Sequence, residues 1–476
     1  MQIISGILRK SGVRTLIFLM MLFTAGDLAA DGFELKLKIH SAVNEPVLLA
    51  HYYGSSVFVD DTIRLDASGA GVLKRDTLLP QGLYKIYLNQ ETHFDFLLGA
   101  DQVLTIEGPD FNVGKLVIEG ARESVEFLAY MNWVKERQAK RAALEERRKA
   151  VPPDEGDAIS KEIALVNKEV TDYWKTKSSE YPGSFLGAFL MSNYMEELNT
   201  EDIPETYTRN DSLLWVFQYH FRKSHFFDYM DLTDERFIYT PVLKQKLDTY
   251  FERVLLQVYD SVKPAAYGLI EKVEPHPAMF RYLVSYLLNS SLTSRIMGMD
   301  ALFVDIARDF YLSGKAVWAD QATLDKIREN VIFLENNLMG NAARDLQMET
   351  HEGLPFRLYQ QNDRFLVLAF YEPDCSHCRE YIPRLYNEIY LPYRDKGLNV
   401  VAVYTMDNRE EWSEFLKKYE LSDWHNVWDE HHVTRFKVLY DVRTTPSVYL
   451  LDQGKQIIAK KFTIEFLHEF LKFNLK

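Results

Sequence analysis

The chain has 476 residues, of which 47% are hydrophobic and 26% charged, enough for several globular cores. Its formal net charge of −14 argues against a surface for nucleic acids or anionic membranes. The chain holds two cysteines, so it can form at most one internal disulfide.

Residues 1–30 have the pattern of a secretory signal peptide. Arg9, Lys10 and Arg14 precede the short apolar run TLIFLMMLF, and small residues follow near Ala30. An uncleaved anchor is the alternative, but the run is shorter than the roughly 20 residues that span a bilayer. No later stretch is apolar enough to span one. We therefore expect an exported protein of the periplasm or cell envelope, with no stable membrane insertion after signal cleavage.

Residues 31–118 have the pattern of a small β-sandwich. Phe33, Leu35, Leu37 and Ile39 alternate with polar or charged residues, which is the period of a half-buried strand. Short strand-like segments separated by turn residues follow. They lie at residues 46–53, 57–66, 83–89, 93–99, 102–108 and 115–120.

Residues 119–339 have the apolar spacing of helices and predict an all-α domain. A long charged helix over 123–149 ends before a Pro-Pro-Asp turn, and a second helix runs back over 158–177. The mixed charges of the first helix favour a solvated face, with a partner-binding helix as the alternative. Further helices are predicted at 184–192, 212–220, 241–262, 277–288, 299–311 and 323–337.

Residues 340–476 alternate between strands and helices, as in an α/β domain. The run RFLVLAF at 364–370 is almost continuously apolar, which is typical of a central strand covered on both faces. A loop with the two cysteines and a helix over 377–390 follow it. The remaining predicted elements are a strand at 399–405, helices at 410–419 and 433–439, a hairpin of 447–451 with 456–461, and a helix at 463–473.

The two cysteines form the motif Cys375-Ser-His-Cys378. A disulfide between them would close a very small loop and add little stability, so a reactive dithiol explains the pair better than a structural crosslink. A lone CxxC is weak evidence, because metal sites use the same spacing. Its position between an apolar strand and a helix, with TTPSVYLLD downstream, makes the pattern specific.

The segments FLVLAFYEPDCSHCREYIP and YDVRTTPSVYLLDQGKQI resemble the thioredoxin superfamily, and within it the TlpA-like exported thiol-disulfide oxidoreductases. The whole layout is similar to a Bacteroidetes-type family in which a small β domain and an uncharacterised helical domain precede the TlpA-like domain. The resemblance implies a thioredoxin-like fold over residues 340–476. It also implies that Thr445-Pro446 matches the cis-proline loop.

Five residues are the predicted catalytic set: Cys375, Cys378, His377, Thr445 and Pro446. At a helix N-terminus, the thiolate of Cys375 is stabilised and attacks a substrate disulfide, and the shielded Cys378 then resolves the mixed disulfide. A partly charged His377 would favour the thiolate and make the couple more oxidising; the alternative is a solvent-exposed side chain without effect. The Thr445 backbone can pair with an extended substrate.

The chain departs from the thioredoxin pattern at two positions. Ala369 replaces the buried aspartate that many thioredoxins carry six residues before the first cysteine, and Asp374 replaces the common tryptophan. Asp374 would oppose thiolate formation by like-charge repulsion. Glu372 or Glu380 could act as proton acceptor, although each also fits a solvated carboxylate.

The predicted function is an exported thiol-disulfide oxidoreductase that exchanges disulfides with envelope proteins. It needs no cofactor besides its own redox-active disulfide, and its expected partners are protein thiol or disulfide substrates and a redox partner protein. One alternative is a non-catalytic envelope binding or scaffold protein. A metal carrier that combines the cysteines with a histidine is another, since His425, His431 and His432 lie near Asp429. A polar loop is the simpler interpretation of that stretch, and no metal site is predicted.

Overall fold

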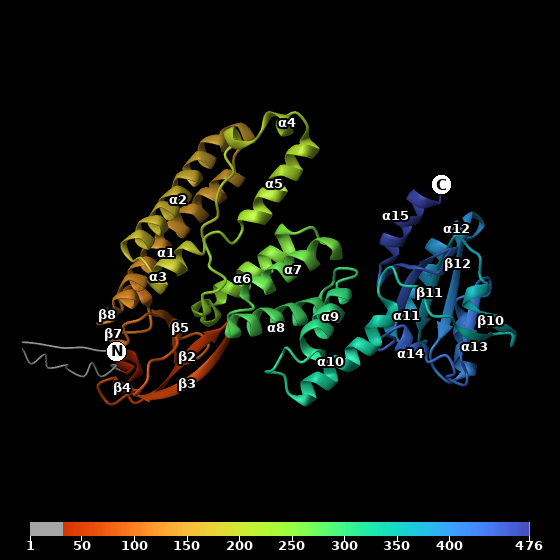
Figure 1. Cartoon of the computed structure of the whole chain (residues 1–476), viewed down its shortest axis with the longest axis horizontal. Helices are drawn as coiled ribbons and strands as arrows, with labels where there is room; N and C mark the ends of the chain where they lie inside the picture. Colours follow the sequence, from red (N-terminus) through yellow and green to blue (C-terminus); the bar gives the residue numbers. More distant parts are fainter. Residues whose placement is uncertain (1–31, 476) are drawn as a thin grey trace, which may run out of the picture. The chain divides into compact units, whose positions relative to one another are not determined.

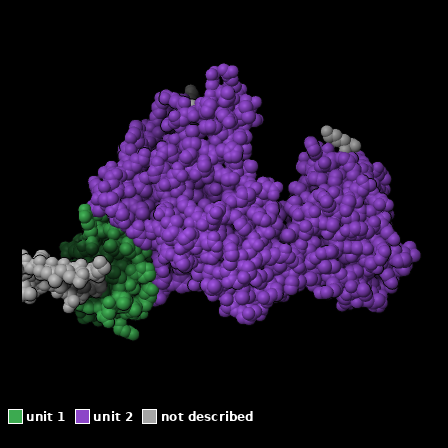
Figure 2. Space-filling view, viewed as in Figure 1, with its two compact units in different colours: residues 1–49, 60–136 green, residues 50–59, 137–476 purple. Residues whose placement is uncertain are grey.

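The computed structural model describes residues 32–475 and divides into two compact units, coloured separately in Figure 2. The first contains the chain up to residue 49 together with 60–136, and the second contains 50–59 and the chain from 137 onward. The predicted signal peptide lies outside the described residues. The predicted domain boundaries at 118 and 339 stay predictions.

The N-terminal part folds as two four-stranded sheets, with strand orders β4-β1-β7-β8 and β3-β2-β5-β6. Leu35, Leu37 and Ile39 of β1 are at most 1% exposed and belong to a core with residues from both sheets, which confirms the predicted sandwich. Strand β4 was missed by the sequence analysis. The strands are β1 (Glu34–Ile39), β2 (Pro46–Tyr53), β3 (Ser56–Arg64), β4 (Ala70–Lys74), β5 (Gly82–Tyr87), β6 (His93–Leu98), β7 (Val103–Gly108) and β8 (Val117–Glu119).

The central region is helical, as predicted (Figure 1). Its helices are α1 (Arg122–Lys149), α2 (Pro153–Glu180), α3 (Phe185–Met191), α4 (Glu205–Thr208), α5 (Asp211–His225), α6 (Pro241–Thr249), α7 (Tyr259–Val273), α8 (Pro277–Thr293), α9 (Asp300–Ile306) and α10 (Gln321–Leu334). Two of them, α6 and α9, continue into π-helical turns, Tyr250–Val254 and Ala307–Leu312.

The single helix predicted over 241–262 is wrong. The chain leaves the helix at Leu255, whose backbone is extended, and α7 begins at Tyr259. The side-chain amide of Gln257 donates hydrogen bonds to the carbonyls of Phe251 and Leu255, which partners two backbone acceptors at the break. Leu255 itself is 3% exposed. Apolar spacing continues through the break, so only tertiary burial distinguishes two helices from one.

The C-terminal part is a seven-stranded sheet with strand order β10-β9-β13-β12-β11-β14-β15. The central pair β11–β12 is parallel, and β14 runs antiparallel to β11 on the other side. The strands are β9 (Gln347–Thr350), β10 (Pro355–Arg357), β11 (Phe365–Tyr371), β12 (Leu398–Tyr404), β13 (His425–Trp428), β14 (Ser447–Asp452) and β15 (Ile457–Lys460). The helices are α11 (Ser376–Arg384), α12 (Leu391–Tyr393), α13 (Arg409–Lys418), α14 (Phe436–Leu439) and α15 (Ile464–Asn474).

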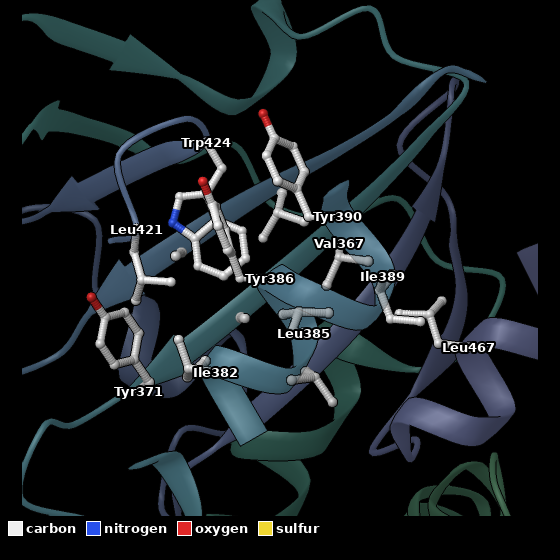
Figure 3. Packing of buried hydrophobic residues seen from close by; sticks show 14 of the residues in the cluster. Val367, Tyr371, Ile382, Leu385, Tyr386, Ile389, Tyr390, Leu421, Trp424 and Leu467 are labelled. Carbon is white, nitrogen blue, oxygen red and sulfur yellow. The ribbon is translucent and has the colours of Figure 1, made fainter. Parts of the chain in front are cut away.

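Strand β11 is covered on both faces, as its apolar run predicted. Val367, Ala369 and Tyr371 belong to one buried cluster, together with residues of α11, α13 and α15, and part of it is drawn in Figure 3. Leu368 and Phe370 belong to a second cluster, with residues of α14. Because both faces are packed, the strand has little freedom to move, and its C-terminal end fixes the start of the loop that leads to Cys375.

Three strands of this sheet, β9, β10 and β13, were not predicted. The interpretation of the stretch from His425 as a polar loop is wrong for its first four residues, because β13 pairs in parallel with β12. The remaining histidines follow the strand. Short segments such as QMET and HNVW carry too little periodicity to mark a strand, and the two pair with each other although they are distant in sequence.

Among residues 32–475, no helix is long and apolar enough to cross a membrane.

Candidate redox site at the α11 N-terminus

Cys375 is the residue that caps α11. It follows the short loop after β11, and its sulfur accepts a hydrogen bond from the backbone N–H of Cys378 at 3.4 Å. The first amide groups of a helix have no partner within the helix, and they carry the positive end of the helix dipole. The sulfur of Cys375 therefore occupies the position at which a negative charge is best stabilised.

The pKa of Cys375 is lowered from its ordinary value. Burial alone would raise this pKa, but hydrogen bonding with Cys378, with Thr445 and with the backbone of His377 outweighs it. The side chain remains partly exposed. Cys375 thus combines access to solvent with a stabilised thiolate, the two properties of an attacking thiol.

Cys378 differs in both respects. It lies one turn further along α11, is fully buried, and belongs to the core beneath the helix. Burial raises the pKa of its thiol to about 12. Both cysteines are free thiols in this structure. The difference in burial matches the predicted roles of attacking and resolving thiol, which stay predictions.

Thr445 and Pro446 lie beside the dithiol, although about seventy residues separate them from it. The peptide bond between them is cis, and the Cys375 thiol donates a hydrogen bond to the Thr445 carbonyl at 3.3 Å. A cavity of about 480 Å³, lined by Pro446, Tyr381 and Thr444 among others, opens next to this loop. The structure therefore brings four of the five predicted site residues together through their side chains or backbone.

His377, the fifth predicted residue, contributes through its main chain. Its side chain is exposed, and within the described part of the chain its imidazole makes no hydrogen bond or ion pair. The backbone N–H of His377, by contrast, helps to lower the pKa of Cys375. The neighbouring Asp374 is also exposed, so water surrounds the carboxylate that was expected to oppose the thiolate.

Glu372 is the carboxylate most closely tied to the site. Its Oε1 accepts a hydrogen bond from the Thr405 hydroxyl at 3.2 Å, and its Oε2 accepts one from the Thr445 hydroxyl at 3.1 Å. Its carbonyl accepts the backbone N–H of Cys375. Glu380, the other proton-acceptor candidate, is exposed on α11. Thr405 was missed by sequence reasoning, since nothing near it in the sequence indicates a partner on another strand.

The position of the missing thioredoxin aspartate is apolar. Ala369 is completely buried on β11, and the aromatic residue two positions on, Tyr371, accepts a hydrogen bond from the indole N–H of Trp412 at 2.8 Å. Burial raises the pKa of Tyr371 well above its usual value, so this phenol stays neutral. Position 369 therefore provides no acidic side chain near Cys378. The carboxylate that is hydrogen-bonded within the site is that of Glu372.

The histidine-rich stretch does not assemble a metal site. The Asp429 carboxylate accepts hydrogen bonds from the backbone N–H groups of Val433 and Thr434, and His432 pairs with Asp407. Between residues 32 and 475, no group of three histidine, cysteine or acidic side chains is placed to hold a metal ion. Asp429 thus has a structural role in its loop, and nothing favours the metal-carrier alternative.

Two comparisons with known proteins bear on this region. Residues 339–460 match the model of the AhpC/TSA family. This match assigns a thioredoxin-like domain to the C-terminal region. The chain is also similar to the thiol-disulfide oxidoreductase ResA of Bacillus cereus, with 24% identity over 126 residues, which are 26% of this chain and 70% of the relative. The predicted thioredoxin-superfamily membership is confirmed. The relative's name, thiol-disulfide oxidoreductase, is also the enzyme class predicted from the sequence.

Two solved structures with similarity to the chain come from Cytophaga hutchinsonii and Bacteroides caccae. A domain of a possible thiol-disulfide isomerase from Cytophaga hutchinsonii is 36% identical, covers 29% of this chain and 92% of its own, and has a TM-score of 0.28. A thioredoxin-like protein from Bacteroides caccae is 18% identical, covers 59% of this chain and 98% of its own, and has a TM-score of 0.46.

Proposed function

We propose that this protein is an exported thiol-disulfide oxidoreductase that exchanges disulfides with proteins of the cell envelope. The proposal rests on the arrangement of the two cysteines at the start of one helix. Cys375 is partly exposed and its sulfur accepts a hydrogen bond from a backbone N–H, whereas Cys378 is buried. The family match and the similarity to a thiol-disulfide oxidoreductase support the same chemistry. The signal-like pattern of residues 1–30 supports export.

The exchange proceeds in two steps. The Cys375 thiolate attacks one sulfur of a substrate disulfide, forms a mixed disulfide, and expels the other substrate sulfur as a thiolate. Cys378 then passes its proton to the substrate thiolate expelled in the first step and attacks the Cys375 sulfur, which releases the second substrate thiolate. Two electrons pass to the substrate, a Cys375–Cys378 disulfide remains, and a redox partner protein reduces it again. The reversed sequence oxidises a substrate dithiol. An extended substrate segment pairs with the Thr445 backbone beside the reacting sulfur.

Two assays test the chemistry. The wild-type protein should accelerate the reduction of insulin by dithiothreitol, and glutathione titration should reveal one dithiol couple. Cys375→Ser should abolish both, whereas Cys378→Ser should retain the first step and accumulate mixed disulfides. A wild-type rate no faster than that of Cys375→Ser would refute the catalytic role and favour the scaffold alternative.

Export and substrate class need separate tests. Residues 1–30 fused to a reporter that is active only outside the cytoplasm should give activity, and the same fusion without its three basic residues is the control. Proteins trapped by Cys378→Ser in cells should be envelope proteins with cysteines. An inactive reporter fusion, or trapped proteins that are all cytoplasmic, would contradict the proposed location.

A further inference from the structure

The hydroxyl of Thr445 lies where several hydrogen-bond acceptors compete for one proton. In this structure, it donates to the Glu372 carboxylate at 3.1 Å. The Thr445 backbone adjoins Cys375, whose thiol donates a hydrogen bond to the Thr445 carbonyl at 3.3 Å. Hydrogen bonding by the Thr445 side chain also lowers the pKa of both cysteines, against the larger opposing effect of burial. A hydroxyl carries a single donor hydrogen. While the Thr445 hydroxyl donates its hydrogen to Glu372, it cannot donate it to either sulfur.

Hydrogen bonds fix the position of the Glu372 carboxylate, so that it can compete with the sulfurs for the Thr445 hydroxyl. Its second oxygen lies 3.2 Å from the hydroxyl of Thr405, which follows β12, is 1% exposed and shares its hydrogen with the Tyr371 carbonyl at the same distance. The backbone of Glu372 adjoins that of the first cysteine, since its carbonyl accepts the N–H of Cys375 at 3.3 Å. Hydrogen bonding by the Glu372 backbone also lowers the pKa of Cys378, against the larger effect of burial. The carboxylate is therefore fixed between two strand ends instead of being free to swing into solvent.

We propose that Glu372 is a positioning residue that sets the reactivity of Cys375 by withholding the Thr445 hydroxyl from its sulfur. In the resting thiol state, the Thr445 hydroxyl points to Glu372, and the Cys375 thiol donates to the Thr445 carbonyl. When Cys375 ionises, its sulfur becomes a second anionic acceptor for the same hydroxyl. The carboxylate then competes with the thiolate and keeps the attacking thiol less acidic than its helix position alone would make it. This inference rests on the proposed function.

The alternative physical effect is simple charge repulsion between the Glu372 carboxylate and the Cys375 thiolate. Both effects predict that removal of the carboxylate lowers the pKa of Cys375. They differ in their dependence on Thr445: repulsion persists without the hydroxyl, whereas competition for the hydroxyl vanishes. A double-mutant cycle separates the two.

The experiment measures the pKa of Cys375 in the full chain from the pH dependence of its alkylation by iodoacetamide, read by mass spectrometry. Glu372→Ala should lower this pKa by up to about one unit, the size of one hydrogen bond. Thr445→Val keeps the side-chain shape and removes the hydroxyl, and it should raise the pKa in the wild-type background by less than in the Glu372→Ala background. In the Thr445→Val background, Glu372→Ala should have little effect.

Glu380→Ala is the matched control, because it removes an exposed carboxylate from α11 that bonds to neither threonine in this structure. It should leave the pKa of Cys375 within a few tenths of a unit. Glu372→Gln provides a second variant if the alanine protein unfolds, and thermal unfolding of each protein verifies the fold. An unchanged or raised Cys375 pKa in Glu372→Ala, or an equal drop with and without the Thr445 hydroxyl, overturns the proposal.

These measurements do not depend on catalysis. If the protein fails to exchange disulfides but the cycle shows coupling between Glu372 and Thr445, the proposed function is wrong and the positioning role stands. If exchange is fast but the coupling is absent, the function stands and the role of Glu372 is wrong.

Discussion

Replacing His377 with proline should make the dithiol more reducing, and we expect the main chain of His377 to be responsible because its imidazole is exposed. Proline has no backbone N–H, and at the second position of α11 its ring is tolerated because first-turn amides have no partner within the helix. The variant therefore removes one of the hydrogen bonds that lower the pKa of Cys375. Less stabilisation of the thiolate raises this pKa and favours the disulfide.

The magnitude follows from one hydrogen bond to a charged sulfur. A loss of about 1.4 kcal/mol would move the potential of this two-electron couple by roughly 30 mV to more negative values. The shift is fully expressed only at a pH above the pKa of Cys375, because the missing bond acts on the thiolate. Glutathione titrations at several pH values, with quenching and mass spectrometry of the two redox states, measure it.

His377→Ala is the control, since alanine keeps the amide and removes the exposed imidazole. It should shift the potential by clearly less than the proline variant does. Equal shifts in the two variants would assign the effect to the imidazole, as the sequence suggested. No shift in the proline variant would refute the contribution of the amide.

Three further predictions concern the same domain. At neutral pH, iodoacetamide should label Cys375 before Cys378, because burial raises the Cys378 pKa to about 12; preferential labelling of Cys378 would reverse their roles. Tyr371→Phe should lower the free energy of unfolding in urea by about 1–3 kcal/mol, since the buried indole N–H of Trp412 loses its acceptor; an unchanged midpoint would contradict this. Lys460→Ala should cost about 3 kcal/mol or more, because this buried ammonium pairs with a carboxylate and an asparagine; a loss below 1 kcal/mol would indicate little net contribution.

The sequence was sufficient wherever neighbouring residues carry the information. The apolar run before the cysteines identified a strand buried on both faces, since burial on two sides removes the alternation of a half-exposed strand. The motif at Cys375 and the proline at Pro446 identified the thioredoxin-like domain, because each is a short, local pattern. The alternation from Phe33 to Ile39 likewise identified a sandwich strand and its buried face.

Contacts between distant segments decided the rest. The strands β9, β10 and β13 are short, and the hairpin of β9 and β10 joins the sheet through β13, which is far along the chain, so local periodicity could not reveal them. The break at Leu255 depends on burial and on the Gln257 amide. The site shows the same division most clearly. Its two sulfurs could be read from one motif, but the bridge from Glu372 to Thr405 and Thr445 joins three strand ends that only the folded sheet brings together.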